Sequence, residues 1–273
     1  MRHRHLQVNG LRLHILEFHG DESLDVPLVC IHGVTNHAWF WHDVAERLAD
    51  RRRVIALDLR GHGDSQWSTE QRYATVDHVD DLSAALDALD LGTVDLAGLS
   101  WGGLIALGLA TRRPETVRAF VMLDVPASFE RSETDIPPQP RAFANHGEVL
   151  DWERRAYPRA RAGLAQLIAT HSTRPSTEGG LVRKHDPYFR SHWPFRSDDA
   201  WDELRRVRTP LQVVLAADSE VLTPEVARRM VLAAPTAQLC TIPDCGHLIP
   251  VDRPTQLADS MGAFFDSVRE GQL

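Results

Sequence analysis

The sequence predicts an α/β protein whose mostly parallel sheet is covered by helices on both faces. Short apolar runs alternate with helical patterns over residues 28–123, and the alternation resumes over 209–273. One strand-to-helix junction in the first stretch holds a Gly-x-Ser-x-Gly turn. Parallel strands need such alternation, because each crossover must return over a face of the sheet.

The elements follow in order from local signals. Leu6–Val8 and Leu11–Phe18 should pair as an antiparallel hairpin, because Asn9-Gly10 between them is a strong turn dipeptide. Further strands are expected at 28–31, 54–58, 93–97, 117–123, 211–216 and 237–242. Helices are expected near 39–49, 77–89, 101–111, 224–233 and 254–269. Residues 1–125 and 209–273 are therefore assigned to one core.

Residues 126–208 interrupt this pattern after the sixth strand. They are rich in Pro, Arg and aromatic residues, with short helix-like runs near 147–156 and 158–170. A loop of about 80 residues is too long for a compact domain. We therefore expect a helical cap, inserted into the core and lying over the active site.

The Gly-x-Ser-x-Gly turn is Gly98-Leu99-Ser100-Trp101-Gly102, between an apolar strand and a helix of small residues. Such a nucleophile elbow forces its serine into a strained conformation, so the positions two before and two after it must be small. The serine hydroxyl then stands clear of the sheet edge. Ser100 is accordingly the candidate nucleophile.

Three other motifs flank the elbow in a definite order. His32-Gly33-Val34-Thr35 follows an early strand, Arg60-Gly61-His62-Gly63 follows the next strand, and Cys245-Gly246-His247 comes late. With the elbow, they resemble the α/β-hydrolase superfamily over nearly the whole chain. The resemblance implies a capped serine hydrolase, and it implies no metal and no organic cofactor.

A serine hydroxyl needs a base to accept its proton and a third group to orient that base. His247 is our candidate base, because a loop after the last strand can fold back over Ser100. His32 and His62 are the alternatives, but the superfamily uses their motifs for loop architecture. The backbone N–H groups of Trp101 and of Val34 or Gly33 should form the oxyanion hole.

The acid of the triad has three candidates. The superfamily's usual position lies in the loop after strand 211–216, and in this register it falls on Ser219, with Asp218 and Glu220 on either side. Asp124 ends strand 117–123, and its interval from Ser100 resembles that of the zearalenone-type lactonases. We favour Asp124, with Glu220 and then Asp218 as alternatives.

The aromatic residues indicate the substrate class. Trp152 and Trp193 lie in the expected cap and Trp39 follows the oxyanion loop, so all three are candidate substrate-binding residues. Apolar pockets with a few polar groups suit a medium-sized hydrophobic ester or lactone. Leu248 stands where carbon–carbon bond hydrolases of the meta-cleavage type usually carry an aromatic residue. A non-catalytic small-molecule receptor on the same fold and a biosynthetic thioesterase or cyclase are the alternatives.

Composition excludes other classes. The formal net charge is −8 and no basic cluster accompanies a nucleic-acid-binding motif, so we expect no nucleic-acid partner. No apolar stretch approaches the roughly 18 residues of a membrane span. The N-terminus has no apolar run typical of a signal peptide, and the scattered histidines and three cysteines lack metal-site spacing. A cytoplasmic enzyme without membrane contact or bound metal is expected, whereas the oligomeric state is not predicted.

Overall fold

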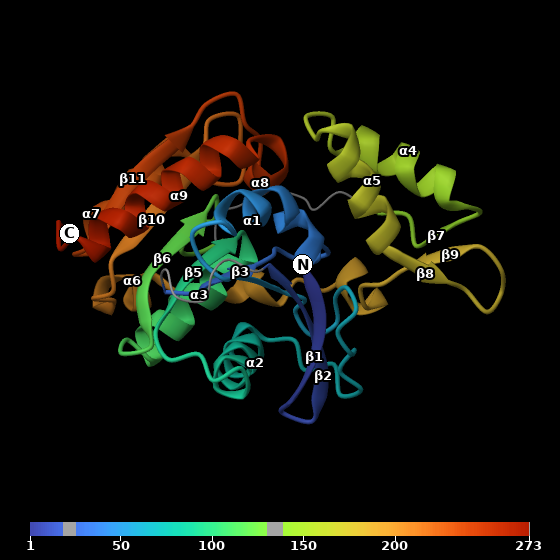
Figure 1. Ribbon diagram of the computed structural model, residues 1–273, viewed down its shortest axis with the longest axis horizontal. Coiled ribbons are helices and arrows are strands. Elements are labelled where there is room, and N and C mark those ends of the chain that lie inside the picture. The colour runs from blue at the N-terminus through green and yellow to red at the C-terminus, as the bar shows by residue number, and fades with distance from the viewer. Residues whose placement is uncertain (19–25, 130–138, 273) are drawn as a thin grey trace.

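The core of the protein is an eight-stranded sheet, seen in a computed structural model that describes residues 1–18, 26–129 and 139–272 (Figure 1). Its strands are β1 (Arg2–Val8), β2 (Leu11–Phe18), β3 (Leu28–Ile31), β4 (Val54–Leu57), β5 (Val94–Leu99), β6 (Val117–Leu123), β10 (Leu211–Ala216) and β11 (Ala237–Ile242). They lie in the order β1-β2-β4-β3-β5-β6-β10-β11. Only the pairings made by β2 are antiparallel, which confirms the expected mostly parallel sheet.

The N-terminal hairpin turns where the sequence predicts it. Asn9 and Gly10 have φ angles of 49° and 76°, the left-handed pair that a tight two-residue hairpin turn requires. Val8 therefore pairs with Leu11, and the register continues to Arg2 opposite Glu17. The first strand is longer than expected, because the polar residues from Arg2 onward also pair with β2.

Helices cover both faces of the sheet. They are α1 (His42–Leu48), α2 (Thr75–Ala88), α3 (Trp101–Arg112), α7 (Pro224–Ala233), α8 (Ile249–Asp252) and α9 (Pro254–Arg269), with a 3-10 turn, η1 (Ala38–Trp41), before α1. Successive strand residues point to opposite faces. Ile31 packs in one core with α2 and α3, whereas Cys30 packs in the other with α1 and α9. Strands buried on both faces explain why their sequences are continuously apolar.

The segment between β6 and β10, here called the insertion (126–208), has its own small elements. They are α4 (His146–Ala156), α5 (Ala162–His171), α6 (Trp201–Arg206), the 3-10 turns η2 (Pro187–Arg190) and η3 (Pro194–Ser197), and a sheet of β7 (Ala142–Phe143), β9 (Leu181–Arg183) and β8 (Thr173–Pro175). Sequence reasoning missed this sheet, because strands of two or three residues carry no readable alternation. In Figure 1, α4, α5 and the small sheet stand together at one end of the molecule, away from β11.

Polar contacts tie the later half of the insertion to core loops. The Tyr73 hydroxyl donates to Asp186, and the Thr75 hydroxyl donates to Asp198. The indole N–H of Trp67 donates to the Lys184 carbonyl over 2.8 Å. Among the helices of the described residues, none has the length and hydrophobicity needed to cross a membrane.

Candidate active site

The nucleophile elbow forms as the sequence predicts. Ser100 lies between β5 and α3 with φ 53° and ψ −126°, a conformation that residues other than glycine rarely adopt. A Cβ atom on Gly98 would lie 2.1 Å from the Gly102 carbonyl oxygen, and one on Gly102 would lie 2.3 Å from that of Ile31. Only glycine therefore fits at these two positions. The elbow presents Ser100 at the sheet edge where the parallel strands end.

His247 and Asp124 form a hydrogen-bonded pair at the same edge. His247 lies in the loop after β11, and its Nδ1 is 2.8 Å from Oδ2 of Asp124, which is completely buried at the end of β6. Because Asp124 is a carboxylate, Nδ1–H is the donor. Nε2 is then left as the nitrogen that can accept a proton.

Ser100 and His247 line one pocket of about 730 Å³. No hydrogen bond joins the Ser100 hydroxyl to His247 among the described residues, and such contacts often tighten only when substrate binds. The core supplies both of these side chains, together with Gly33 and Val34, and the insertion supplies the pocket's other wall. The pocket therefore brings together these four candidate residues, and three others singled out in the sequence, Trp152, Asp218 and Glu220, also line it.

The other two candidate acids are placed differently. Both line the pocket, and Asp218, which is about half exposed, pairs with Arg159 at 2.8 Å. Neither supplies the oxygen that receives Nδ1–H of His247, which is Oδ2 of Asp124. The geometry thus favours Asp124 among the three candidates.

The candidate oxyanion loop lies directly against the elbow. A Cβ atom on Gly33 would be 3.1 Å from Cβ of Ser100, so the backbone after β3 approaches the candidate nucleophile closely. Trp101 is the first residue of α3, and the first N–H groups of a helix have no partner within it. The N–H groups of Trp101 and of Val34 or Gly33 remain our candidate donors.

The alternative bases, His32 and His62, are fully buried and do not line the pocket. Nδ1–H of His32 donates to the Gly33 carbonyl over 2.7 Å, and its Nε2 accepts the N–H of Leu59. Burial lowers the pKa of His32 and lowers that of His62 well below its usual value. Both rings are therefore neutral, and His32 fixes the loop that carries Gly33.

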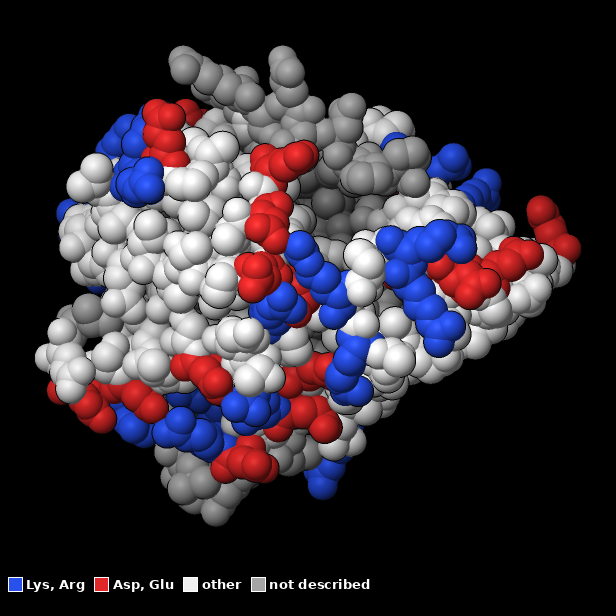
Figure 2. All heavy atoms as spheres, turned by 90° about the horizontal axis from the view of Figure 1, so that it is seen from above, with Lys and Arg blue, Asp and Glu red and all other residues white. Residues whose placement is uncertain are grey.

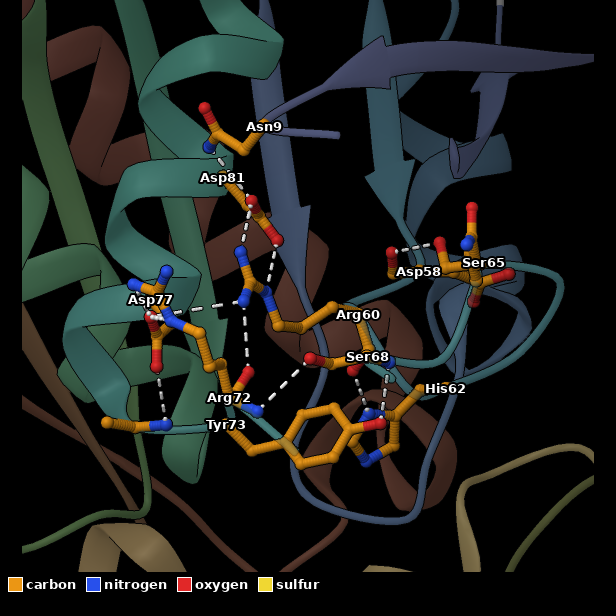
Figure 3. Close-up of polar contacts among 12 residues, drawn as sticks. Asn9, Asp58, Arg60, His62, Ser65, Ser68, Arg72, Tyr73, Asp77 and Asp81 are labelled. Atoms are coloured by element: carbon orange, nitrogen blue, oxygen red, sulfur yellow. Dashed lines mark hydrogen bonds and ion pairs between the residues drawn. The ribbon is translucent and has the colours of Figure 1, made fainter. Parts of the chain in front are cut away.

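The Arg60-Gly61-His62-Gly63 motif is likewise held by structural contacts (Figure 3). Arg60 forms two hydrogen bonds of 2.6 Å to the Asp81 carboxylate and a third to the Arg72 carbonyl. Tyr73, nearby, accepts the N–H of Ser68 over 2.9 Å. These contacts connect the loop after β4 to the start of α2, which explains the motif without a catalytic role.

Of the three candidate substrate-binding tryptophans, Trp152 alone lines the pocket. Trp152 lies on α4, and the Arg183 guanidinium stacks on its ring at 4.4 Å. Trp39 instead stacks on His171, with ring centroids 3.7 Å apart, and Trp193 packs against the core. Trp39 lies in η1 and packs in the core that includes α1 and α9, so it does not line the pocket.

Sequence reasoning did not identify several pocket residues from the insertion. They are Phe129, Gln139, Arg155, Tyr157, Phe195 and Arg196. Seen from above, the surface is hollowed near its centre, with acidic side chains along one edge and basic side chains at the other (Figure 2). Aromatic enrichment of the insertion was visible in the sequence, but its folding decides which rings reach the pocket.

One group in the described part of the chain has the composition of a metal site: His14, Asp58 and Asp64. Its donor atoms are already used. Asp58 accepts Nδ1–H of His14 over 2.7 Å and the backbone N–H groups of Ala38 and Asp64, and Asp64 pairs with Lys184. None of these residues lines the pocket.

The chain resembles known hydrolases over most of its length. It is 31% identical to 2-hydroxy-6-oxo-2,4-heptadienoate hydrolase of Pseudomonas putida over 237 residues, covering 83% of this chain and 84% of that protein. It is 25% identical to an esterase of Mycobacterium tuberculosis, covering 88% and 83% of the two chains. The thioesterase domain from the curacin biosynthetic pathway superposes with a TM-score of 0.86 at 21% identity, covering 96% and 99% of the chains.

At 21% identity, the likeness to the curacin thioesterase domain shows the fold alone. A family model, described as the alpha/beta hydrolase family, matches residues 28–260, which include the elbow, both ends of the insertion and His247. The protein therefore belongs to the alpha/beta hydrolase family.

Proposed function

We propose that the protein is a serine hydrolase that cleaves a medium-sized, largely apolar carboxylic ester or lactone through an acyl-serine intermediate. The observation that carries the proposal is the Asp124–His247 pair, whose histidine lines the same pocket as Ser100 on its elbow. The relatives named as a hydrolase and an esterase support hydrolysis in general.

The geometry supports a two-step reaction. Oγ of Ser100 attacks the substrate carbonyl carbon while its proton moves to Nε2 of His247, and Asp124 stabilises the imidazolium that results. The oxyanion accepts hydrogen bonds from the backbone N–H groups of Trp101 and of Val34 or Gly33. The bond to the alkoxide then breaks, and Nε2 returns the proton to the departing alcohol. Water repeats the sequence on the acyl-serine and releases the acid.

The pocket supports the substrate class. Its walls include the apolar side chains of Leu99, Phe129, Trp152, Phe195, Val221 and Leu248. A cavity of about 730 Å³ has the size of ordinary small-molecule sites. The charged residues Arg155 and Glu220 also line the pocket, so it can accommodate a polar substituent on an otherwise apolar substrate.

Hydrolysis of a carbon–carbon bond is a second candidate activity. One observation favours it: the relative at 31% identity is named as a hydrolase of 2-hydroxy-6-oxo-2,4-heptadienoate. Ester and lactone panels should therefore be run beside this compound. We expect measurable kcat/KM on esters or lactones and little on the dienoate, since Leu248 replaces an aromatic residue after His247. Faster turnover of the dienoate than of every ester would move the activity to that bond type.

The nucleophile is tested by labelling. A fluorophosphonate should add to the protein once, and peptide mapping should place the adduct on Ser100. Ser100→Ala should lose the adduct and about a thousandfold or more of its turnover while unfolding at the same temperature. Labelling at another residue, or an active Ser100→Ala variant, would contradict the assignment. Absence of turnover on every substrate, with intact labelling, would favour a receptor.

A further inference from the structure

Ser219 contacts the oxygen of Asp124 that also contacts His247. Its hydroxyl donates to Oδ2 of Asp124, which accepts Nδ1–H of His247 over 2.8 Å. The Ser219 Oγ in turn accepts the backbone N–H of Val221 over 3.1 Å. Because this N–H occupies a lone pair of Oγ, the hydroxyl proton is directed toward Asp124. Ser219 is thus the donor in its contact with Asp124.

The carboxylate of Asp124 depends on such donors. It is completely buried, and its other oxygen accepts the N–H of Ala216 over 3.2 Å. A buried carboxylate without hydrogen-bond partners is strongly disfavoured. Three donors therefore surround Asp124, from the imidazole, the backbone and Ser219, and two of them share Oδ2.

We propose that Ser219 is a positioning residue of this site, which fixes Oδ2 of Asp124 against Nδ1 of His247. The proposal rests on the serine hydrolase function above. Ser219 lines the same pocket as Ser100, but its hydroxyl donates to Asp124, and it acts through that carboxylate. It lies in the loop after β10, where the superfamily resemblance places an acid, and here it supplies a neutral donor to the acid at the end of β6.

The proposal predicts a specific kinetic signature for Ser219→Ala. The variant loses one of the two donors that fix Oδ2 of Asp124. We therefore expect kcat to fall about tenfold while KM stays within about twofold of the wild type. A carboxylate with fewer donors also holds a protonated imidazole more strongly. The acidic limb of the kcat/KM profile should therefore move to higher pH, by roughly half a pH unit. A purely structural role would not move this limb.

Two substitutions separate the hydroxyl from the volume of the side chain. Ser219→Thr keeps the hydroxyl and should recover kcat to within about threefold of the wild type and restore the pH profile. Ser219→Cys is nearly isosteric with a weak donor, so its kcat should lie between those of the serine and alanine proteins. If the alanine variant unfolds, the kcat of the cysteine variant should still lie below that of the wild type. Equal kcat and equal pH profiles for Ser, Cys and Ala at this position would overturn the proposal.

A double-mutant cycle distinguishes this proposal from the proposed function. Because Ser219 acts through Asp124, Ser219→Ala should add less than about twofold to the loss caused by Asp124→Asn. Full additivity of the two losses would contradict the positioning role. If Asp124→Asn itself remains active, the proposed triad is wrong; if it is inactive while Ser219→Ala is unaffected, only the role of Ser219 is wrong.

Discussion

Asp124→Asn should abolish most activity while leaving the fold intact. The backbone N–H of Ala216 that donates to Oδ1 is fixed, whereas the Ser219 hydroxyl that donates to Oδ2 can rotate. The new amide should therefore keep its oxygen at Oδ1 and place its NH₂ group at the former Oδ2. That NH₂ group faces Nδ1 of His247. Because two donors cannot bond to each other, Nδ1 must be unprotonated and accept the hydrogen bond of the NH₂ group. The imidazole then carries its proton on Nε2. In that tautomer it cannot take the proton of Ser100.

The expected fall in kcat combines two effects of the substitution. The variant has the unproductive tautomer and no charge to stabilise the imidazolium, a combination that cost about 10⁴ in kcat in a well-studied triad. We expect about 10³ to 10⁴ here, equivalent to roughly 4–5.5 kcal/mol. The assay is kcat/KM on a chromogenic ester, together with the rate of fluorophosphonate labelling at Ser100. Both rates should fall together, and ¹⁵N NMR of His247 should report the changed tautomer.

Matched controls are Glu220→Gln and Asp218→Asn, the other two candidate acids. Asp218 pairs with Arg159 rather than with His247, so each control should retain activity to within about fivefold. An active Asp124→Asn protein combined with an inactive Glu220→Gln protein would refute the reasoning and move the acid to the loop after β10.

Three further outcomes are expected. Ala at Gly98 or Gly102 would place Cβ 2.1 or 2.3 Å from a carbonyl oxygen, so each should lose more than about 3 kcal/mol in urea unfolding, whereas Gly92→Ala, with no atom within 4 Å, should be nearly neutral. Trp152→Ala should raise KM for a bulky ester about tenfold more than for an acetate ester, because its ring lines the pocket; Trp193→Ala should not discriminate between them. Burial lowers the pKa of His37 and His78 well below the usual value and that of His185 to about 4. Since the unfolded chain takes up these protons near pH 6.5, stability should fall as pH drops below about 6.5, by about 1.4 kcal/mol per pH unit for each such histidine. Urea midpoints that stay constant from pH 7.5 to 5 would contradict this.

Most core elements could be predicted because their signals are local. Asn9-Gly10 specifies its turn through backbone angles, and Gly98 and Gly102 specify the elbow by leaving no room for a side chain. Apolar runs such as Leu28–Ile31 are buried on both faces, so their length alone marks them as strands. Helix ends were less certain: α5 begins at Ala162 rather than near 158, after a loop containing Pro158. Proline disfavours helix in the residue before it, which separates α4 from α5.

The pocket walls could not be predicted in the same way. Trp39 and Trp152 are equally aromatic in the sequence, but stacking on His171 takes the first away and stacking by Arg183 holds the second at the pocket. Arg183 comes from β9, a strand of three residues that pairs with neighbours of two and three residues. Such placement depends on contacts between segments far apart in the chain, and no local pattern encodes it.

The candidate acid was partly predictable from the sequence. The order of the strands limits where this residue can lie, but it does not decide between the candidates. β6 and β10 are parallel neighbours, so the residues after them meet at one edge, where His247 also lies after β11. An acid after either strand could therefore reach the imidazole. Two carboxylates there would repel each other within hydrogen-bond distance, and one would be driven to bind a proton. A carboxylate after β6 with a hydroxyl after β10 avoids this conflict, because Ser219 adds a donor and no charge.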